Sequence, residues 1–546
     1  MINVNQNKEN QIITSILKGD SVLITGCAGT GKSTLINKIH LVLQQKYEKD
    51  EIGITAMTGI ASLNIGGKTL QSYLKIGIEK EWQKMVQKVN LKERREGKNQ
   101  ILAFYDKKHE GIWSRCKCLI IDEVSMLGAR YFKNLHKTSR SLRKLKNFFG
   151  GMQLVLIGDF FQLPPVTKRD EKKERYLFES KLFLNNIKTI FELDYIFRQR
   201  DPIFLKVLDE VRYGRLTKFG DQKLRECIRP LDCSDGIIPT LLFSLNKNVN
   251  YYNNNKIQKL KGEIRIYISK DYENGFKKDR NIKSFKSNIY NSMINTYELS
   301  KLDKENKWKF DKLNNGKYVD ILRLKIDAQV MYLKNTPEIG LYNGSRGVVT
   351  GFEDSDDYLP KVKFKNGVEI YIQMCMNEII INKSSKNEKI LIRCQLPLKL
   401  AWAFTVHKSQ GKTIDYAIIS MRNLFCKGHF YVALSRVRTL SGLELLGDYD
   451  PSKIETDLKV IEFYATFSPG AKKVLDEIKI EMEIKRNIVI KKQERKMERK
   501  RKRKIERKRK RKIERKRKRK IERKRKRKME RDKEEERKSK RRKIMK

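Results

Sequence analysis

GCAGTGKS, at residues 26–33, is the stretch that decides the fold of this 546-residue chain. It follows the apolar run SVLIT (21–25), which predicts a buried parallel strand. It precedes TLINKIHLVLQ (34–44), in which apolar residues recur at helical spacing. A strand, a glycine-rich turn and a Gly-Lys-Ser that opens a helix form the context of a phosphate-binding loop. A chance turn is the alternative, and the flanking strand and helix argue against it.

The chemistry of such a loop gives each residue type a role. Gly26, Gly29 and Gly31 let the backbone curl so that its N–H groups point at phosphate oxygens. The helix N-terminus adds partial positive charge, Lys32 neutralises the β- and γ-phosphates, and Ser33 can hold Mg²⁺. The chain is therefore predicted to bind a nucleoside triphosphate. The residues expected around it are Gly26, Cys27, Ala28, Gly29, Thr30, Gly31, Lys32, Ser33 and Thr34.

CLIIDEVSML (118–127) is a second buried-strand pattern, and it contains paired carboxylates. In a P-loop enzyme the first carboxylate, Asp122, completes the Mg²⁺ shell from the end of a neighbouring strand. Glu123 suits the base that polarises the attacking water. The alternative is an ordinary strand that meets its helix at an acidic N-cap. Behind a phosphate-binding loop, the pair predicts hydrolysis of the triphosphate.

QLVLIGDFFQLPPV (153–166) narrows the class of enzyme. Another apolar strand is followed by Gly158-Asp159, then Gln162, then a pair of prolines. A side-chain amide at a strand end beside the nucleotide can sense whether the γ-phosphate is present. With this third element the chain resembles the superfamily 1 DNA helicases, and specifically the petite-integration-frequency (PIF) family of 5′-to-3′ helicases.

The resemblance runs from about residue 10 to about residue 465, with seven motifs in the family's order. Besides the three stretches above, the matching segments are IFRQRDPIFLKVLDEVRYG (196–214), IIPTLLFSLNKNVNYYNNNKIQKLKGE (237–263), LKIDAQVMYLKNTPEIGLYNGSRGVVTGF (324–352), QLPLKLAWAFTVHKSQGKTIDYAIIS (395–420) and FYVALSRVRTLSGLEL (430–445). The chain departs from the family pattern at Gln71, Phe148, Asp327 and His429, and none of these four lies on the triphosphate chemistry.

The repeated apolar strands alternating with helical stretches favour an α/β fold with parallel sheets. The resemblance implies two RecA-like P-loop NTPase lobes, with the nucleotide in the cleft between them. It also implies a small β-barrel insertion in the second lobe. The predicted divisions are 1–190 for the first lobe, 191–264 and 390–468 for the two parts of the second lobe, 265–389 for the insertion, and 469–546 for a basic C-terminal tail.

The resemblance also assigns the catalytic roles. Lys32 and Ser33 would hold ATP and Mg²⁺, with Asp122 on the metal and Glu123 as the base. Gln162 would contact the γ-phosphate, and Gln11 or Asn10 would hold the adenine. Arg198 and Arg436 would reach across from the second lobe as arginine fingers. Without the motif context, a surface salt bridge would be the preferred interpretation of each arginine.

Two further groups of residues are candidates for contact with the DNA strand. The first group, Thr58 and Gly59, lies in ITAMTGIASL, and the second group lies in HKSQG. The second group is His407, Lys408, Ser409 and Gln410. A lone histidine is usually structural, so that interpretation of His407 stays open. The expected partners are single-stranded and partly duplex DNA, and we expect a monomer with no membrane association.

Cysteine and hydropathy patterns exclude several classes. The eight cysteines form no paired CxxC clusters, which argues against a zinc ribbon or an iron–sulfur cluster. No apolar run approaches the length of a membrane helix. MINVNQNKENQ lacks the features of a signal peptide and of a mitochondrial leader. A soluble, intracellular protein is expected, in the nucleus rather than the mitochondrion.

Charge is the other strong signal, because the net charge is +55. Residues 497–528 are four copies of (Met/Ile)-Glu-Arg-Lys-Arg-Lys-Arg-Lys, and residues 491–546 carry about half of the charge. Such a surplus implies a polyanionic partner, of which nucleic acid is the simplest. One apolar residue in eight drifts around a helix and builds no coiled-coil seam. A solvated tail, marginally helical or disordered, is predicted; a low-complexity expansion without a selected role is the alternative.

The sequence therefore predicts an ATP-dependent DNA helicase that translocates 5′ to 3′ and acts in DNA repair, recombination or telomere maintenance. A decayed relative that only binds nucleic acid is one alternative. Within the enzyme class, the alternatives are an RNA helicase and the helicase of a mobile element.

Overall fold

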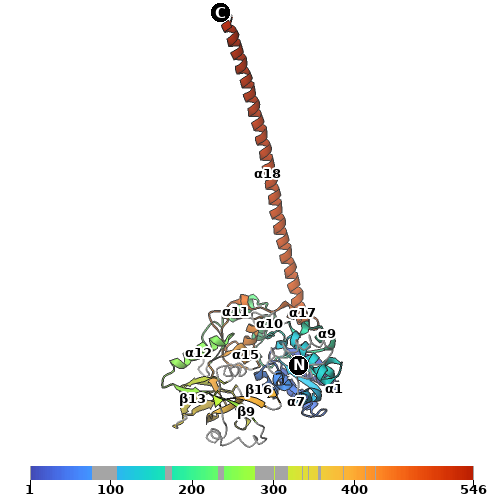
Figure 1. Ribbon diagram of the computed structural model, residues 1–546, viewed down its shortest axis with the longest axis vertical. Helices are drawn as coiled ribbons and strands as arrows, with labels where there is room; N and C mark the ends of the chain where they lie inside the picture. The colour runs from blue at the N-terminus through green and yellow to red at the C-terminus, as the bar shows by residue number, and fades with distance from the viewer. Residues whose placement is uncertain are drawn as a thin grey trace. The chain divides into compact units, whose positions relative to one another are not determined.

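The computed structural model describes most of the chain, and it is drawn in Figure 1. The described residues are 2–76, 107–165, 175–231, 239–276, 300–301, 318–334, 336–341, 344–354, 358–384, 387–411, 413–422, 424 and 426–544. The sequence also predicts a surface insertion of low order at about 80–112, and most of that segment lies outside this description. The chain divides into two compact units, Met1–Phe463 and Tyr464–Lys546.

The first lobe is built on a six-stranded sheet in the order β3-β2-β4-β5-β1-β6, with every pairing parallel. Its strands are β1 (Val22–Gly26), β2 (Ile52–Ala56), β3 (Lys68–Thr69), β4 (Cys118–Asp122), β5 (Gln153–Ile157) and β6 (Thr189–Leu193). Its helices are α1 (Ile2–Lys18), α2 (Lys32–Leu43), α3 (Gly59–Asn64), α4 (Leu70–Leu74), α7 (Lys107–Arg115), α8 (Ala129–Arg143) and α9 (Lys181–Asn186). Strands β1, β4 and β5 are buried along their whole length, as expected for apolar runs covered on both faces.

The boundary predicted at residue 190 is wrong. It falls inside β6, which pairs with β1 from Thr189 to Leu193 and so belongs to the first sheet. The first lobe therefore extends at least to Leu193. Pairing between strands that are more than 160 residues apart is not visible in a local pattern.

The second lobe has a four-stranded parallel sheet in the order β19-β7-β20-β21. Its strands are β7 (Thr240–Phe243), β19 (Ala403–Thr405), β20 (Ala417–Ile419) and β21 (Leu443–Leu445). Its helices are α10 (Pro202–Tyr213), α11 (Lys218–Arg225), α12 (Asn246–Lys259), α15 (Val406–Ser409), α16 (His429–Leu434) and α17 (Leu458–Tyr464). The two parallel sheets confirm the α/β prediction.

Antiparallel strands interrupt the second lobe between β7 and β19. They form a five-stranded sheet in the order β15-β14-β13-β12-β18, a four-stranded sheet in the order β10-β9-β17-β16, and the pair β11-β8. The strands are β8 (Arg265–Ile268), β9 (Lys270–Phe276), β10 (Ser300–Lys301), β11 (Ile321–Leu324), β12 (Gln329–Tyr332), β13 (Arg346–Phe352), β14 (Pro360–Phe364), β15 (Glu369–Tyr371), β16 (Cys375–Ser384), β17 (Asn387–Gln395) and β18 (Leu398–Leu400). A separate apolar cluster that includes Val330, Val349 and Leu398 packs this region.

The predicted end of the insertion, residue 389, is too early. Strand β17 pairs with β9, and β18 pairs with β12, so the insertion runs to Leu400. The Asn- and Lys-rich composition of residues 265–320 predicts a surface insertion of low order, yet strands β8, β9 and β10 lie in its described part.

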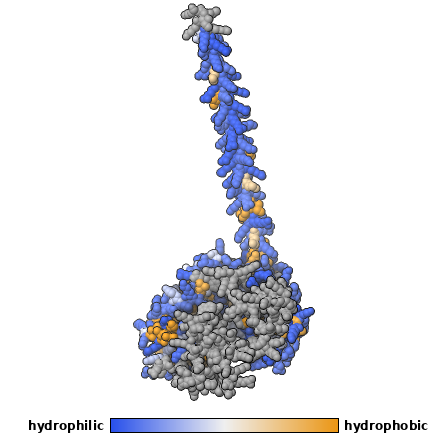
Figure 2. Space-filling view, in the orientation of Figure 1, coloured by the Kyte–Doolittle hydropathy of each residue, from blue (hydrophilic) through white to orange (hydrophobic). Residues whose placement is uncertain are grey.

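The second compact unit consists mainly of α18 (Pro469–Ile544), a single helix of 76 residues. Every side chain from residue 479 to residue 540 is exposed, and Figure 2 shows a mostly hydrophilic helix with a few apolar patches. Three octads contain the ion pairs Glu498–Lys502, Glu506–Lys510 and Glu514–Lys518, each between residues four apart. Glutamate placed N-terminal to lysine at this spacing supports a helix, which offsets part of the repulsion among the basic residues.

Membrane helices and metal clusters are both missing from the part of the chain that the structure describes. None of the described helices combines the length and apolarity needed to cross a membrane. Among the same residues, no three His, Cys, Asp or Glu side chains gather where they could hold a metal ion.

Candidate active site

The phosphate-binding loop joins the end of β1 to the start of α2. Gly29 and Gly31 have φ angles of +88° and +80°, in the left-handed region that favours glycine. A Cβ at Gly29 would lie 2.8 Å from the Cβ of Arg198, so this position also requires glycine for space. The amide of Phe197 donates to the carbonyl of Gly29 at 2.8 Å. The segment around Arg198 is thus packed directly against the loop.

A cavity of about 380 Å³ opens beside the loop. Residues from both lobes line it: Ala28, Gly29, Thr30, Gly31, Lys32, Ser33, Thr34, Glu123, Gln162, Phe197, Arg198, Gly411, Thr413, Arg436 and Arg438. All five residues predicted to be catalytic are in this set. Gly26 and Cys27 do not line the cavity, although both belong to the predicted triphosphate set.

Lys32 is held against the backbone of its own loop. Its Nζ donates to the carbonyls of Gly26 and Cys27, both at 2.7 Å. Burial lowers the pKa of Lys32, and the nearby charges of Asp159 and Glu123 act in the opposite direction. If a triphosphate bound, its charged oxygens could replace these neutral carbonyls as acceptors for Lys32. Hydrogen bonds to charged acceptors are stronger.

The two carboxylates lie at the end of β4. The Oδ1 of Asp122 accepts a hydrogen bond from the amide of Glu123 at 2.8 Å. Burial, followed by the charge of Glu123, raises the pKa of Asp122 to about 7. Glu123 has a φ of +55°, which is strained for a residue with a side chain. Its Oε2 accepts a hydrogen bond from the Nε2 of Gln410 at 2.8 Å.

The donor set fits Mg²⁺. Asp122 supplies a buried carboxylate and Ser33 a hydroxyl beside the cavity, and Mg²⁺ prefers such oxygen ligands together with phosphate oxygens. A cation bound by these oxygens would also offset the free-energy cost of burying the adjacent carboxylates of Asp122 and Glu123.

Both predicted finger arginines come from outside the first sheet and reach the cavity. Arg198 donates from Nη1 to the carbonyl of Ser435 at 2.9 Å and from Nε to Thr413 Oγ1 at 3.0 Å. Burial, and next the charge of Arg436, lowers the pKa of Arg198 to about 9. Arg436 is 2% exposed and donates from Nε to the carbonyl of Val432 at 2.9 Å. Within the described residues neither arginine forms a salt bridge, so the surface-pair alternative does not hold.

Gln162 is 4% exposed and lines the cavity, where the γ-phosphate is expected. Its Oε1 finds no hydrogen-bond partner among the described residues. Gly428, which precedes α16, approaches this region so closely that a Cβ there would lie 2.5 Å from the carbonyl of Phe161. The backbone beside Gln162 therefore touches the helix that leads to Arg436.

The predicted DNA contacts in HKSQG are only partly accessible. Ser409 is 1% exposed and donates to the carbonyl of Val406 at 2.7 Å. Gln410 is 2% exposed and is bound to Glu123. The prediction that these two residues contact DNA is wrong, because both side chains are buried. His407 and Lys408 are partly exposed, and the His407 ring lies 5.2 Å from that of His429.

The other predicted contacts lie on the first lobe. Thr58 accepts a hydrogen bond from the amide of Ala61 at 3.2 Å and so caps α3, and Gly59 is exposed beside it. Gln11 is exposed on α1 and is not among the residues that line the cavity. The structure gives it no contact with the expected triphosphate site.

Several residues of this site escape prediction from the sequence. The hydroxyl of Tyr431 accepts a hydrogen bond from the amide of Ala28 at 3.1 Å. Asp159 and Arg212 form a buried ion pair of 3.3 Å between the end of β5 and α10. Gln199, buried beside Arg198, belongs with them. Their residue types and spacing carry no separate signal, although all lie within or beside the motifs.

Comparisons with known proteins find relatives of this chain. A family model described as PIF1-like helicase matches residues 1–222, and one described as the 2B domain of DNA helicase Pif1 matches residues 315–352. The human ATP-dependent DNA helicase PIF1 is 35% identical over 463 residues, which cover 84% of this chain and 63% of that protein. The ATP-dependent DNA helicase RRM3 of Saccharomyces cerevisiae is 31% identical, with 84% and 66% covered. The chain thus spans less than two thirds of the length of these relatives.

Solved structures show the same similarity. The crystal structure of Pif1 helicase from Candida albicans matches with a TM-score of 0.68 and 31% identity, covering 85% of this chain and 99% of that one. Pif1 helicase from Bacteroides in complex with ADP-AlF3 and ssDNA matches with a TM-score of 0.58 and 28% identity, covering 84% and 97%.

Proposed function

Because this chain belongs to the PIF1-like helicase family, we propose that it is an ATP-dependent DNA helicase that moves 5′ to 3′ along single-stranded DNA and separates the duplex ahead of it. The observation that carries the proposal is the cavity shared by two lobes. Lys32, Glu123 and Gln162 line it from the first lobe, and Arg198 and Arg436 from the residues that follow β6. A site divided in this way changes when the lobes move, so hydrolysis can drive motion along a strand.

The residues divide the work of hydrolysis. Lys32 and the amides of the loop bind the β- and γ-phosphates, and Glu123 orients the attacking water and accepts its proton. Ser33 and Asp122 would hold Mg²⁺, which would supply positive charge that offsets the negative charge of the phosphates. Arg198 and Arg436 stabilise charge on the transferred phosphoryl group. Gln162 contacts the γ-phosphate.

Gln410 has a different role from the one predicted for it. Its amide holds Glu123 through a hydrogen bond of 2.8 Å, and it follows His407 and Lys408 closely in the chain. We propose that DNA contacts His407 and Lys408 on the second lobe and Thr58 and Gly59 on the first. Contact at HKSQG would then be relayed to the base through Gln410. The Bacteroides relative forms a complex with ssDNA, which supports this class of partner.

We propose that the sheet β15-β14-β13-β12-β18 is the family's small β-barrel, because the 2B-domain match at 315–352 covers β11, β12 and β13. We propose a monomer that acts in DNA repair, recombination or telomere maintenance. A nuclear location is supported by the arginine–lysine runs of α18, which match the import pattern many times.

A non-catalytic nucleic-acid binder is the competing function, and an ATPase assay separates the two. The wild-type protein should hydrolyse ATP, and single-stranded DNA should stimulate the rate. Glu123→Gln should bind ATP and hydrolyse almost none. A wild-type protein that binds DNA but hydrolyses no ATP would favour the competing function.

A further inference from the structure

Gln199 lies next to Arg198 in the segment that precedes α10, and its side chain is 1% exposed. Its Nε2 donates two hydrogen bonds, one to the carbonyl of Ser435 at 3.1 Å and one to the carbonyl of Val437 at 2.7 Å. These two carbonyls stand on either side of Arg436. One buried amide therefore holds the backbone on both flanks of a finger arginine that comes more than 230 residues later in the sequence.

The other end of the same side chain faces the phosphate-binding loop. The Oε1 of Gln199 would lie 3.3 Å from a Cβ placed on Gly29, and it finds no hydrogen-bond partner among the described residues. Phe197, two residues earlier, is tied to the carbonyl of Gly29 through its amide. The segment 197–199 thus touches the loop that holds the triphosphate and also holds the backbone that carries Arg436.

We propose that Gln199 is a positioning residue for ATP hydrolysis. It holds the Ser435–Val437 backbone so that the Arg436 guanidinium meets the developing charge on the γ-phosphate, and its own segment is tied to the loop by the hydrogen bond from the Phe197 amide to the Gly29 carbonyl. The proposal rests on the proposed function, because a finger arginine matters only if ATP is hydrolysed. Without both carbonyl contacts, Arg436 would remain in the protein but would be less well placed in the transition state.

The fold provides a matched control at Gln153. This residue is 7% exposed, and its Nε2 also donates to two backbone carbonyls, those of Ile16 and Asp20, both at 2.8 Å. Its Oε1 likewise has no partner among the described residues. Gln153 does not line the nucleotide cavity. Gln153→Met therefore removes two hydrogen bonds from a buried amide to backbone carbonyls, as Gln199→Met does, but at a position that does not line the nucleotide cavity.

The experiment measures DNA-stimulated ATPase, thermal stability and nucleotide affinity for the full chain and both variants. The two variants should lose similar thermal stability. Only Gln199→Met should lower kcat, by about tenfold or more, with the KM for ATP changed by no more than about threefold. Its affinity for ADP–aluminium fluoride should fall by about tenfold while its affinity for ADP is retained, because an arginine finger acts on the transition state.

A double variant tests the link to Arg436. If Gln199 acts through that arginine, Gln199→Met with Arg436→Ala should be about as slow as Arg436→Ala alone. The proposal would be overturned if the kcat losses of the two single changes multiplied in the double variant. It would also be overturned if Gln199→Met had a kcat close to that of the wild type, or if Gln153→Met lost as much kcat as Gln199→Met. Should Gln199→Met not fold, Gln199→Asn retains the amide but is too short to reach both carbonyls, and the same outcomes apply. A wild-type protein without DNA-stimulated ATPase would instead overturn the proposed function.

Discussion

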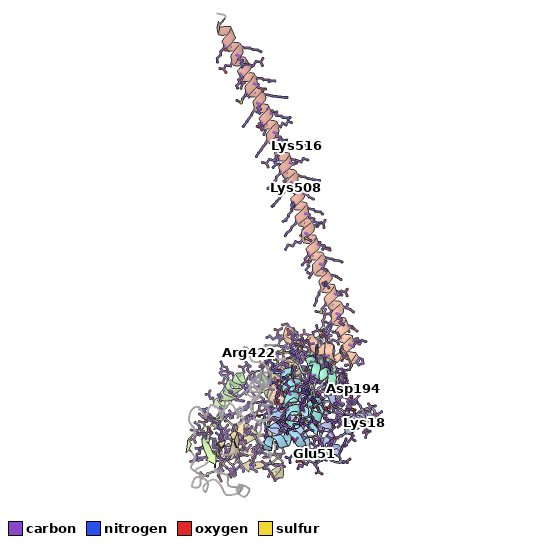
Figure 3. The ribbon with its side chains drawn as sticks, turned by 45° about the vertical axis from the view of Figure 1, so that its right-hand side comes forward. Lys18, Glu51, Asp194, Arg422, Lys508 and Lys516 are labelled. Atoms are coloured by element: carbon purple, nitrogen blue, oxygen red, sulfur yellow. The ribbon has the colours of Figure 1, made fainter. Side chains whose placement is uncertain are left out.

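The nucleotide cavity and helix α18 are built on opposite principles. In the cavity, side chains from positions as distant as Lys32 and Arg436 line one space, and both of these are held by hydrogen bonds to backbone carbonyls. In α18 the side chains from 479 to 540 are exposed, and the ion pairs join residues four apart. Lys508 and Lys516, one octad apart, project from the helix in Figure 3 among many similar side chains. Function in the cavity should therefore depend on single atoms, whereas function in α18 should depend on the number of charges.

The finger arginines should give the largest effect. Arg198→Ala or Arg436→Ala should lower the kcat of DNA-stimulated ATPase by about 10³-fold or more, the low end of what such fingers contribute. ATP affinity should change far less, because the fingers act in the transition state. Stopped-flow binding and steady-state rates measure the two quantities. Equal losses of affinity and turnover would make the arginines simple binding groups.

Replacing the proposed base, Glu123, should give the next largest loss of ATPase activity. Glu123→Gln should lower kcat by about 10²- to 10⁴-fold while ATP still binds, because the amide cannot accept a proton. Lys32→Ala should lose binding as well, and removal of Mg²⁺ with a chelator should stop the wild-type enzyme. Glu226→Gln, at an exposed carboxylate on the surface, is the control and should be unchanged. A Glu123→Gln rate near that of the wild type would remove the base assignment.

The tail should produce a graded effect. A chain that ends at residue 490 should retain DNA-stimulated ATPase and its polarity but bind DNA more weakly at low salt. The slope of log K against log salt should become shallower by about 0.7 to 0.9 for each phosphate that the tail no longer neutralises. Nuclear accumulation should also disappear in cells. An unchanged slope and location would make the tail inert, whereas loss of ATPase would make it part of the catalytic fold.

The smallest effect concerns the helix itself. Replacing Glu498, Glu506 and Glu514 with glutamine should lower the helix content of α18, measured by circular dichroism, and the loss should shrink as the salt concentration rises. Replacing Arg499, Arg507 and Arg515 with glutamine is the matched control, and it should relieve repulsion and raise the helix content. If both triple variants change the signal in the same direction, the ion pairs do not support the helix.

The residues of the phosphate-binding loop and the two carboxylates can be predicted because their sequence patterns are local. A glycine-rich turn or a pair of carboxylates after a strand is contained in about ten residues, so Lys32 and Glu123 can be found without knowledge of the rest. To predict the roles of Arg198 and Arg436, the order of the motifs along the chain is needed as well. The family resemblance supplies that order.

Burial and strand pairing cannot be predicted in the same way. HKSQG gives no indication of which side chains turn inward, so Ser409 and Gln410 are predicted as DNA contacts although both side chains are buried. The ends of the first lobe and of the insertion depend on pairing between β6 and β1 and between β17 and β9. Asp327, one of the four departures from the family pattern, has a φ of +66°, a left-handed conformation that aspartate tolerates better than most residues.

The most direct test of the account is strand displacement on partial duplexes with either a 5′ or a 3′ single-stranded overhang. The wild-type protein should separate the 5′-overhang substrate only with ATP and Mg²⁺, and it should leave the 3′-overhang substrate paired. The chain ending at residue 490 should show the same preference, and Glu123→Gln should separate neither. Equal action on both overhangs, or displacement by Glu123→Gln, would contradict a helicase whose motion comes from hydrolysis in the cavity between the lobes.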